Sequence, residues 1–288
     1  MIVTKRNKTK RYDKTIIILG DSFGFGHGCS DRTYWVDEDG NEHGKRFDFR
    51  YPSEYCYGSL IAKDNPSWRV VNKSKPGLDN SSMFQDLLKL RKELEHIDYV
   101  FTSFSFDDRM LVRDPRLEED KSKFLSWPRF GHTPKRDEDH IFGYPEPMVF
   151  RMASSDEEIP QVGDTEHYEA LIAFRNELFN PRIANLMSLS LAHAFYSICT
   201  TNDIGYSWSA PDNSSLAKNR MYDHISDIIR NKQIPGIVSH LQLTNTPPFS
   251  QYRAPDGHAN DLGHSKYYTE VIKPVSYTHL TLPTILLV

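Results

Sequence analysis

Cysteine and long hydrophobic runs are scarce in this sequence of 288 residues. The three cysteines, Cys29, Cys56 and Cys199, form no CxxC pair, which argues against a disulfide framework and against a structural zinc site. The apolar runs are too short for a helix that crosses a membrane. The N-terminal stretch is basic but lacks the apolar segment of a signal peptide, so we expect a cytoplasmic protein.

An excess of positive charge is also missing. The chain has 35 Lys and Arg against 39 Asp and Glu, a net charge of −4, so no nucleic-acid partner is expected. The histidines are scattered without an HExxH motif, and no metal site is predicted. Gly24, Gly26 and Gly28 lack the spacing of a dinucleotide loop, and no GK[ST] follows, so no cofactor is predicted. The sequence carries no signature of oligomeric state.

Short β-branched runs alternate with amphipathic stretches along the chain. This alternation predicts an α/β fold, a three-layer α/β/α sandwich around a central parallel sheet of about five strands, with flavodoxin-like topology. The expected strands are residues 15–19, 68–71, 98–104, 204–208 and 236–239. The expected helices are residues 53–63 with Ser53 as a possible N-cap, 80–95, 166–200 with a break at Pro181, 215–231, and 261–272 with Asn260 or Asp261 near the cap.

Two segments do not fit this alternation. Residues 110–165 are rich in charge, Pro and Gly, and we expect an insertion that is either a lid or a solvated excursion. Residues 275–284, VSYTHLTLPT, resemble one reading frame of a transposase-type sequencing-library adapter, the alternative being an ordinary apolar strand. We therefore expect one domain over 1–274 and a non-native tail over 275–288.

The first group of residues that suits chemistry is Gly20-Asp21-Ser22, where the first predicted strand ends. Functional groups in parallel α/β sheets collect at the carboxyl ends of the strands. A serine there can expose its hydroxyl, and its N–H at a helix start can point at developing negative charge. The alternative interpretation of these three residues is a polar turn after a strand.

The second group lies near the other end of the chain, from Asp256 to His264. A serine hydroxyl is a poor nucleophile until a base takes its proton, and histidine is the usual base near neutral pH. A carboxylate beside the imidazole orients it, and Asp256 is close enough in sequence to serve His258. Asp261 and His264 form an alternative acid and base pair.

Together these groups resemble the SGNH (GDSL-type) hydrolase superfamily. Gly20-Asp21-Ser22 is similar to its first block, and His258-Ala-Asn260-Asp-Leu-Gly263-His264 to its last, with Ala259 where proline is usual. Residues 70–80 resemble the second block, in which Gly77 supplies an oxyanion-hole N–H. The resemblance spans residues 15–272.

This resemblance implies a serine hydrolase with Ser22 as nucleophile, His258 as base and Asp256 as the orienting acid. The N–H groups of Ser22 and Gly77 would hold the oxyanion. The residues expected near the substrate are Asp21, Asn80 and Arg109.

Two departures from the family pattern bear on activity. Asp107 stands where the third block has an oxyanion-donating asparagine, and an ionised carboxylate cannot donate; loss of one such donor costs ~10²–10³ in rate. Arg109 could compensate with positive charge, or could pair structurally with Asp107. In addition, Asp256 precedes His258 by two residues rather than three, whereas Asp261 and His264 have the family spacing. We favour His258 because Asn260 and Gly263 follow it as they do in the family.

The expected activity is hydrolysis of a carboxylic ester through an acyl-enzyme. By resemblance, the substrates would be small acyl esters, lipid esters or acetylated carbohydrates. The alternative, motivated by Asp107, is a catalytically impaired protein of the same fold that binds carbohydrate or has a structural role. Phosphate-ester chemistry at the same cleft is a third class, which metal-dependent turnover would indicate.

Overall fold

The computed structural model describes eleven ranges of the chain: residues 12–32, 34–36, 42–44, 51–94, 96–105, 109–112, 148–151, 180–210, 230–243, 251–255 and 257–277. The chain divides into two compact units. One comprises Met1–Ser105 and Leu189–Val288, and the other comprises Phe106–Ser188. The first unit contains the parallel sheet, Ser22 and His258, whereas the predicted site residues Asp107 and Arg109 belong to the second. The expectation of one domain with an insertion at 110–165 stays a prediction.

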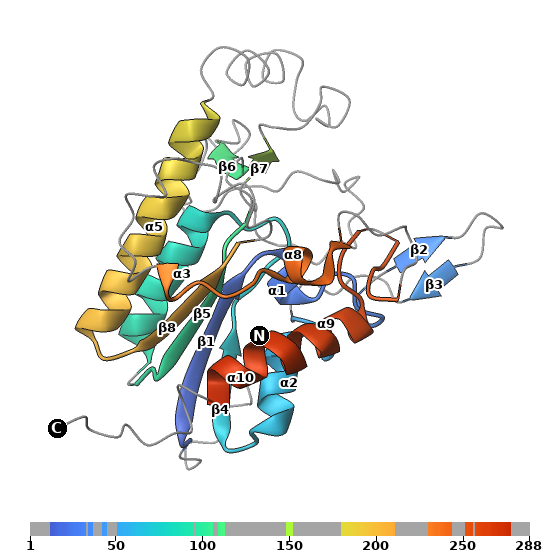
Figure 1. Cartoon of the computed structure of the whole chain (residues 1–288), viewed down its shortest axis with the longest axis horizontal. Coiled ribbons are helices and arrows are strands. Elements are labelled where there is room, and N and C mark those ends of the chain that lie inside the picture. Colours follow the sequence, from blue (N-terminus) through green and yellow to red (C-terminus); the bar gives the residue numbers. More distant parts are fainter. Residues whose placement is uncertain are drawn as a thin grey trace, which may run out of the picture. The chain divides into compact units, whose positions relative to one another are not determined.

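A parallel four-stranded sheet forms the centre of the first unit, in the order β4-β1-β5-β8 (Figure 1). Its strands are β1 (Lys14–Gly20), β4 (Trp68–Asn72), β5 (Tyr99–Ser103) and β8 (Gly205–Ser209). The predicted α/β class with a parallel sheet is confirmed. In chain order the strands lie 2-1-3-4, as in flavodoxin-like sheets, which bind ligands where the order reverses beside the first strand.

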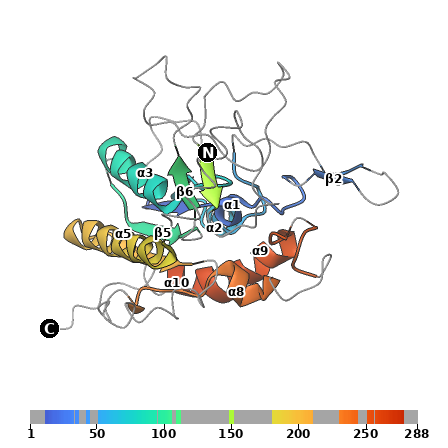
Figure 2. The same cartoon turned by 90° about the horizontal axis from the view of Figure 1, so that it is seen from above.

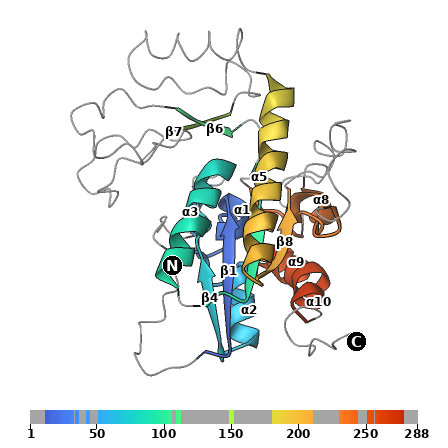
Figure 3. The ribbon, with the colours of Figure 1, turned by 90° about the vertical axis from the view of Figure 1, so that its left-hand side faces the viewer.

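Side chains of β1 alternate between two covered faces of the sheet, which gives the three predicted layers. Ile17 and Leu19 lie in one core cluster with apolar residues of α3 (Asn80–Glu93) and α5 (Pro181–Thr201). Ile18 points to the opposite face, toward α2 (Tyr57–Asp64). A Cβ on Gly58 of that helix would lie only 2.7 Å from Ile18 Cδ1. Figure 3, seen from the side of α3 and α5, shows both helices in front of the sheet.

The predicted strand at 236–239 is wrong. These residues begin the helix α8 (Ile237–Leu241), which Gly236 caps. Helix α8 packs beside α9 (Asp261–Tyr267), as Figure 2 shows. A short apolar run fits a buried helix turn as well as a strand, so hydrophobicity alone did not distinguish them. Gln233 instead forms an isolated parallel bridge with Trp208 at the open edge of β8.

The prediction of Ser53 as a possible N-cap for the helix expected at residues 53–63 is also wrong. Helix α2 begins at Tyr57 after Cys56, which makes no side-chain capping bond. Ser53 organises the turn before the helix instead: its Oγ accepts a hydrogen bond from the Tyr55 N–H at 2.9 Å, and its carbonyl accepts one from Ser59 Oγ at 2.6 Å.

The predicted C-terminal helix is confirmed, with Asn260 as its N-cap. The Asn260 side chain accepts a hydrogen bond from the Gly263 N–H at 2.9 Å. Helix α9 (Asp261–Tyr267) continues through a π-helical turn, η6 (Tyr268–Ile272), into α10 (Lys273–Ser276), which extends two residues into the predicted tail.

Two antiparallel strand pairs were not predicted. One pairs β2 (Tyr34–Val36) with β3 (Glu42–Gly44), and the other pairs β6 (Arg109–Val112) with β7 (Met148–Arg151) in the second unit. The rest of the predicted insertion lies outside the described residues. So do nearly all of the predicted helix at 215–231 and the part of the predicted helix at 166–200 before Asn180. None of the helices in the described ranges combines the length and hydropathy needed to cross a membrane.

Candidate active site

Ser22 is the first residue of the short helix α1 (Ser22–Phe25), directly after the carboxyl end of β1. The carboxylate of Asp21 caps this helix by accepting a hydrogen bond from the Phe23 N–H at 3.0 Å. Gly26 ends it with φ of 80°, a left-handed conformation that favours glycine. The chain therefore turns sharply on both sides of Ser22, and its hydroxyl is held at the switch point of the sheet.

His258 faces Ser22 from a loop close to the other end of the chain. The loop is held by backbone hydrogen bonds from the Ala254 N–H to the His258 carbonyl at 2.8 Å and from the Asn260 N–H to the Tyr252 carbonyl at 3.1 Å. The ring nitrogen Nε2 of His258 lies 2.8 Å from Ser22 Oγ. An imidazole that accepts the serine proton through Nε2 has the geometry of a general base beside a nucleophile.

The segment that carries Ser22 also encloses the His258 ring. The rings of Phe23 and His27 lie with their centroids 4.8 and 4.6 Å from it. A Cβ on Gly28 would lie 2.8 Å from His258 Cβ and 2.6 Å from the Ala259 carbonyl oxygen. Glycine at 28 therefore lets the two segments approach closely. The glycines of this turn are evident in the sequence, but the sequence did not identify Phe23, His27 or Gly28 as neighbours of His258.

Two residues predicted to lie near the substrate, Asp21 and Asn80, are buried and join the ends of β1 and β5. Ser105 links them, because its Oγ donates to Asp21 Oδ2 at 3.1 Å and its N–H donates to Asn80 Oδ1 at 2.7 Å. Ser105 lies two residues after the end of β5. These contacts tie both residues to the turn that carries Ser22, and the position expected for them near a substrate stays a prediction.

Gly77 lies in the turn after β4, the strand that neighbours β1. Its φ of 75° is left-handed, so a glycine fits this position better than a residue with a side chain. The same connection is tied to the nucleophile turn by Asn72, whose Nδ2 donates to the Gly24 carbonyl at 3.0 Å. The predicted oxyanion donors Ser22 and Gly77 thus lie at the same edge of the sheet.

The alternative pair, His264 and Asp261, is not brought together as an acid and base. The Asp261 carboxylate accepts two hydrogen bonds from Ser30 instead, at 2.9 Å from the N–H and 2.6 Å from Oγ. His264 is 1% exposed and stacks on Tyr57, and neither ring nitrogen has a hydrogen-bond partner among the described residues. Burial, with a smaller contribution from His258, lowers the pKa of His264 to about 3. This histidine is therefore a neutral packed ring.

Three predicted site residues cannot be placed. Asp256 and Asp107 lie outside the described residues, and Arg109 is described only as the first backbone position of β6. The roles expected for them stay predictions.

Other nucleophiles and metal ligands in the described ranges do not form a second centre. Cys29 and Cys56 are fully buried, and burial raises the pKa of each thiol, which disfavours the reactive thiolate. Among the residues that the structure describes, no three His, Cys, Asp or Glu side chains gather as metal ligands would.

No family model matches this chain, and no curated protein matches its sequence. Several solved structures are similar to it at low identity. The psychrotrophic esterase EstA from Pseudoalteromonas sp. is 12% identical, with 91% of this chain and 98% of that chain covered and a TM-score of 0.45. TesA is 10% identical, with 93% and 100% covered and a TM-score of 0.45. A carbohydrate esterase is 10% identical, with 96% and 71% covered and a TM-score of 0.45.

Proposed function

We propose that this protein is a serine hydrolase of the SGNH type that cleaves carboxylic esters through an acyl-enzyme on Ser22. The observation that carries the proposal is the 2.8 Å contact between Ser22 Oγ and His258 Nε2, at the carboxyl end of the first strand of a parallel sheet. A nucleophile and its base within hydrogen-bond reach are the minimum required for acyl transfer.

In the proposed reaction, His258 Nε2 takes the Ser22 proton as Oγ attacks the ester carbonyl carbon. The resulting imidazolium then gives that proton to the departing alkoxide, which leaves as an alcohol. A water molecule, deprotonated by the same imidazole, attacks the acyl-enzyme, and the imidazolium returns the proton to Ser22 Oγ as the ester bond breaks and the acid leaves. The Phe23 and His27 rings pack against the imidazole that carries both proton transfers.

The N–H groups of Ser22 and Gly77 are the proposed donors to the oxyanion, and Asp256 is the proposed partner of the His258 ring. Asp107 would not donate to the oxyanion while ionised, so we expect slower turnover than an asparagine would allow, by ~10²–10³ if no other donor replaces it. Activated esters with good leaving groups are therefore the suitable first substrates.

The test is reaction of the purified protein with a fluorophosphonate probe and with p-nitrophenyl acetate. Ser22→Ala is expected to abolish labelling and to lower kcat/KM by at least ~10³-fold, because the nucleophile is removed. His258→Ala should lower it to a similar extent. Ser197→Ala, an exposed serine of α5, is the matched control and should react like the wild type.

Labelling that persists in Ser22→Ala would refute the assignment of the nucleophile. A wild-type protein that folds but neither takes the probe nor turns over the ester would favour the alternative function, a carbohydrate-binding or structural role of the same fold. The sequence observation behind that alternative is the aspartate at position 107.

A further inference from the structure

A pair of hydrogen bonds outside the Ser22–His258 contact joins the same two segments of the chain. Asp261 Oδ1 accepts from the Ser30 N–H at 2.9 Å, and Asp261 Oδ2 accepts from Ser30 Oγ at 2.6 Å. Ser30 lies on the loop after the nucleophile helix, and Asp261 is the first residue of α9, immediately after the His258 loop. Both carboxylate oxygens are thus committed to one residue 231 positions away.

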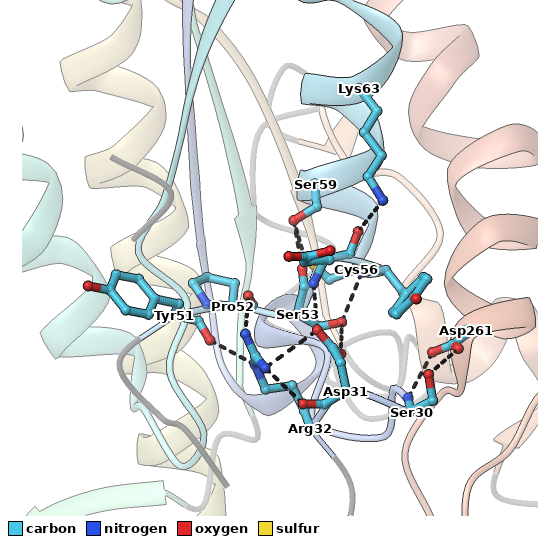
Figure 4. A network of polar contacts seen from close by, with 12 residues as sticks. Ser30, Asp31, Arg32, Tyr51, Pro52, Ser53, Cys56, Ser59, Lys63 and Asp261 are labelled. Atoms are coloured by element: carbon cyan, nitrogen blue, oxygen red, sulfur yellow. Dashed lines mark hydrogen bonds and ion pairs between the residues drawn. The ribbon is translucent and has the colours of Figure 1, made fainter. Parts of the chain in front are cut away.

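The loop that bears Ser30 is itself firmly anchored (Figure 4). The Asp31 carboxylate accepts from Ser53 Oγ at 2.5 Å and from the Glu54 N–H at 2.9 Å. The Arg32 guanidinium donates to the carbonyls of Tyr51 and Pro52, at 3.0 and 3.1 Å. These bonds fix the loop to the turn before α2, so Ser30 offers a stationary partner rather than one that follows Asp261.

The contacts that Phe23, His27 and Gly28 make with His258 are close but not directional. The Phe23 and His27 rings and the Gly28 backbone pack against the imidazole and its own backbone. Packing of this kind limits approach but permits sliding along the contact, whereas a two-bond carboxylate contact specifies both distance and orientation. The Ser30–Asp261 contact therefore supplies a constraint that the packing lacks.

We propose that Asp261 is a positioning residue, which holds the His258 imidazole at hydrogen-bond distance from Ser22 by binding Ser30. This inference rests on the proposed function and assigns to Asp261 a role different from that of an acid for His264. Reaction requires the base and nucleophile to stay in near-attack geometry, and a displacement of about 1 Å can cost ~10²-fold in rate. The contact is exposed, so its loss is expected to change geometry more than stability.

The experiment compares Asp261→Ala, Asp261→Asn, Ser30→Ala and the double variant on p-nitrophenyl acetate. Asp261→Ala is expected to lower kcat about 10-fold with KM within about twofold of wild type. Asp261→Asn should recover most of the activity, because its amide oxygen still accepts from the Ser30 N–H and its NH₂ can donate to Ser30 Oγ. The double variant should be no slower than Asp261→Ala, because both substitutions break one contact.

A second readout keeps this test separate from the test of the proposed function. The ¹⁵N signal of His258 Nε2 reports its hydrogen bond to Ser22, so Ser22→Ala should shift that signal in the wild-type background and much less in the Asp261→Ala background. If the wild type is inert toward esters, the proposed function fails and this signal alone decides the role of Asp261. An equal shift in both backgrounds, or additive losses for Ser30→Ala and Asp261→Ala, would overturn the positioning role.

Discussion

At the scale of single residues, the two histidines near the C-terminal end differ in environment although they are six positions apart. His258 is half-buried and bonded to Ser22, whereas His264 is buried beneath Tyr57 with a pKa lowered to about 3. The first environment places an imidazole nitrogen within hydrogen-bond distance of a hydroxyl. The second keeps a ring neutral at every pH at which the protein is expected to work.

The buried His264 should make stability depend on pH. The unfolded imidazole takes up a proton near pH 6.5, but the folded one does so only near pH 3. The stability that the neutral His264 ring contributes is therefore fully present above about pH 6.5. It is lost as the pH falls toward 3, and the free energy of unfolding drops by at most about 1.4 kcal/mol per pH unit. Urea unfolding at pH 6, 5 and 4 should show this slope in the wild type and a correspondingly smaller slope in His264→Phe.

Leu262→Ala provides the control, because this exposed leucine of α9 carries no titratable group and its loss should leave the slope close to that of the wild type. Equal slopes in the wild type and His264→Phe would show that the folded state does not hold this imidazole neutral.

Sequence blocks predicted Ser22 and His258 as partners, and the structure brings the two side chains within 2.8 Å of each other. The same blocks placed Asp21 and Asn80 near a substrate, which stays a prediction, and did not indicate the bonds of both residues to Ser105. They also assigned Asp261 to its neighbour His264 rather than to Ser30. A carboxylate binds whichever donor the fold places beside it, and that donor can be far away in the sequence.

At the scale of elements, helix α3 illustrates how one side chain fixes the start of a helix beside the site. Asp79 precedes it, and Oδ1 accepts hydrogen bonds from the Ser81 N–H at 2.9 Å and the Ser82 N–H at 3.2 Å. The next residue, Asn80, then reaches Ser105 at the end of β5. The position of the cap thus decides where the link between α3 and β5 is made.

Removing this cap should destabilise the protein measurably. Asp79→Ala is expected to cost about 1–2 kcal/mol in the free energy of unfolding, because two helix N–H groups lose their acceptor. Burial raises the pKa of the Asp79 carboxyl, so its charge is already disfavoured and Asp79→Asn should cost less than about 0.5 kcal/mol. Chemical denaturation of the three proteins measures both values, and similar losses in both variants would contradict the capping role.

The long, strongly patterned elements were predictable from local sequence, and the short ones were not. The β-branched run of β1 and the apolar spacing of α3 matched their observed ranges closely. Helix α8 has only five residues, so its apolar positions carried too little periodicity to separate it from a strand. The hairpin of β2 and β3 has three residues on each side, and its pairing depends on tertiary context.

At the scale of the whole molecule, the described core of the first unit joins the two chain segments of that unit around one aromatic side chain. Phe195 of α5 is fully buried, and its ring contacts Phe84 of α3, Phe104 after β5 and Tyr206 of β8, with centroid separations of 5.2, 5.5 and 6.1 Å. One ring therefore bridges two helices and two strands.

Truncating this ring should be among the costly single changes. Phe195→Ala is expected to lower the free energy of unfolding by about 3–5 kcal/mol, through lost burial and the cavity left behind. Leu88→Ala serves as the control on α3, because Leu88 is 38% exposed and should cost less than about 1 kcal/mol. Urea denaturation of both variants gives the comparison, and a Phe195→Ala loss no larger than the control would place the core elsewhere.

The bond between Ser22 and His258 spans 236 positions of the chain. During synthesis at roughly 5–20 residues per second, the ribosome therefore releases the nucleophile about 10–50 s before the base. Throughout that interval the nascent polypeptide holds a serine without its proton acceptor. Under the proposed mechanism, the growing chain cannot attack esters in its surroundings, and reactivity appears only after the His258 loop has been made.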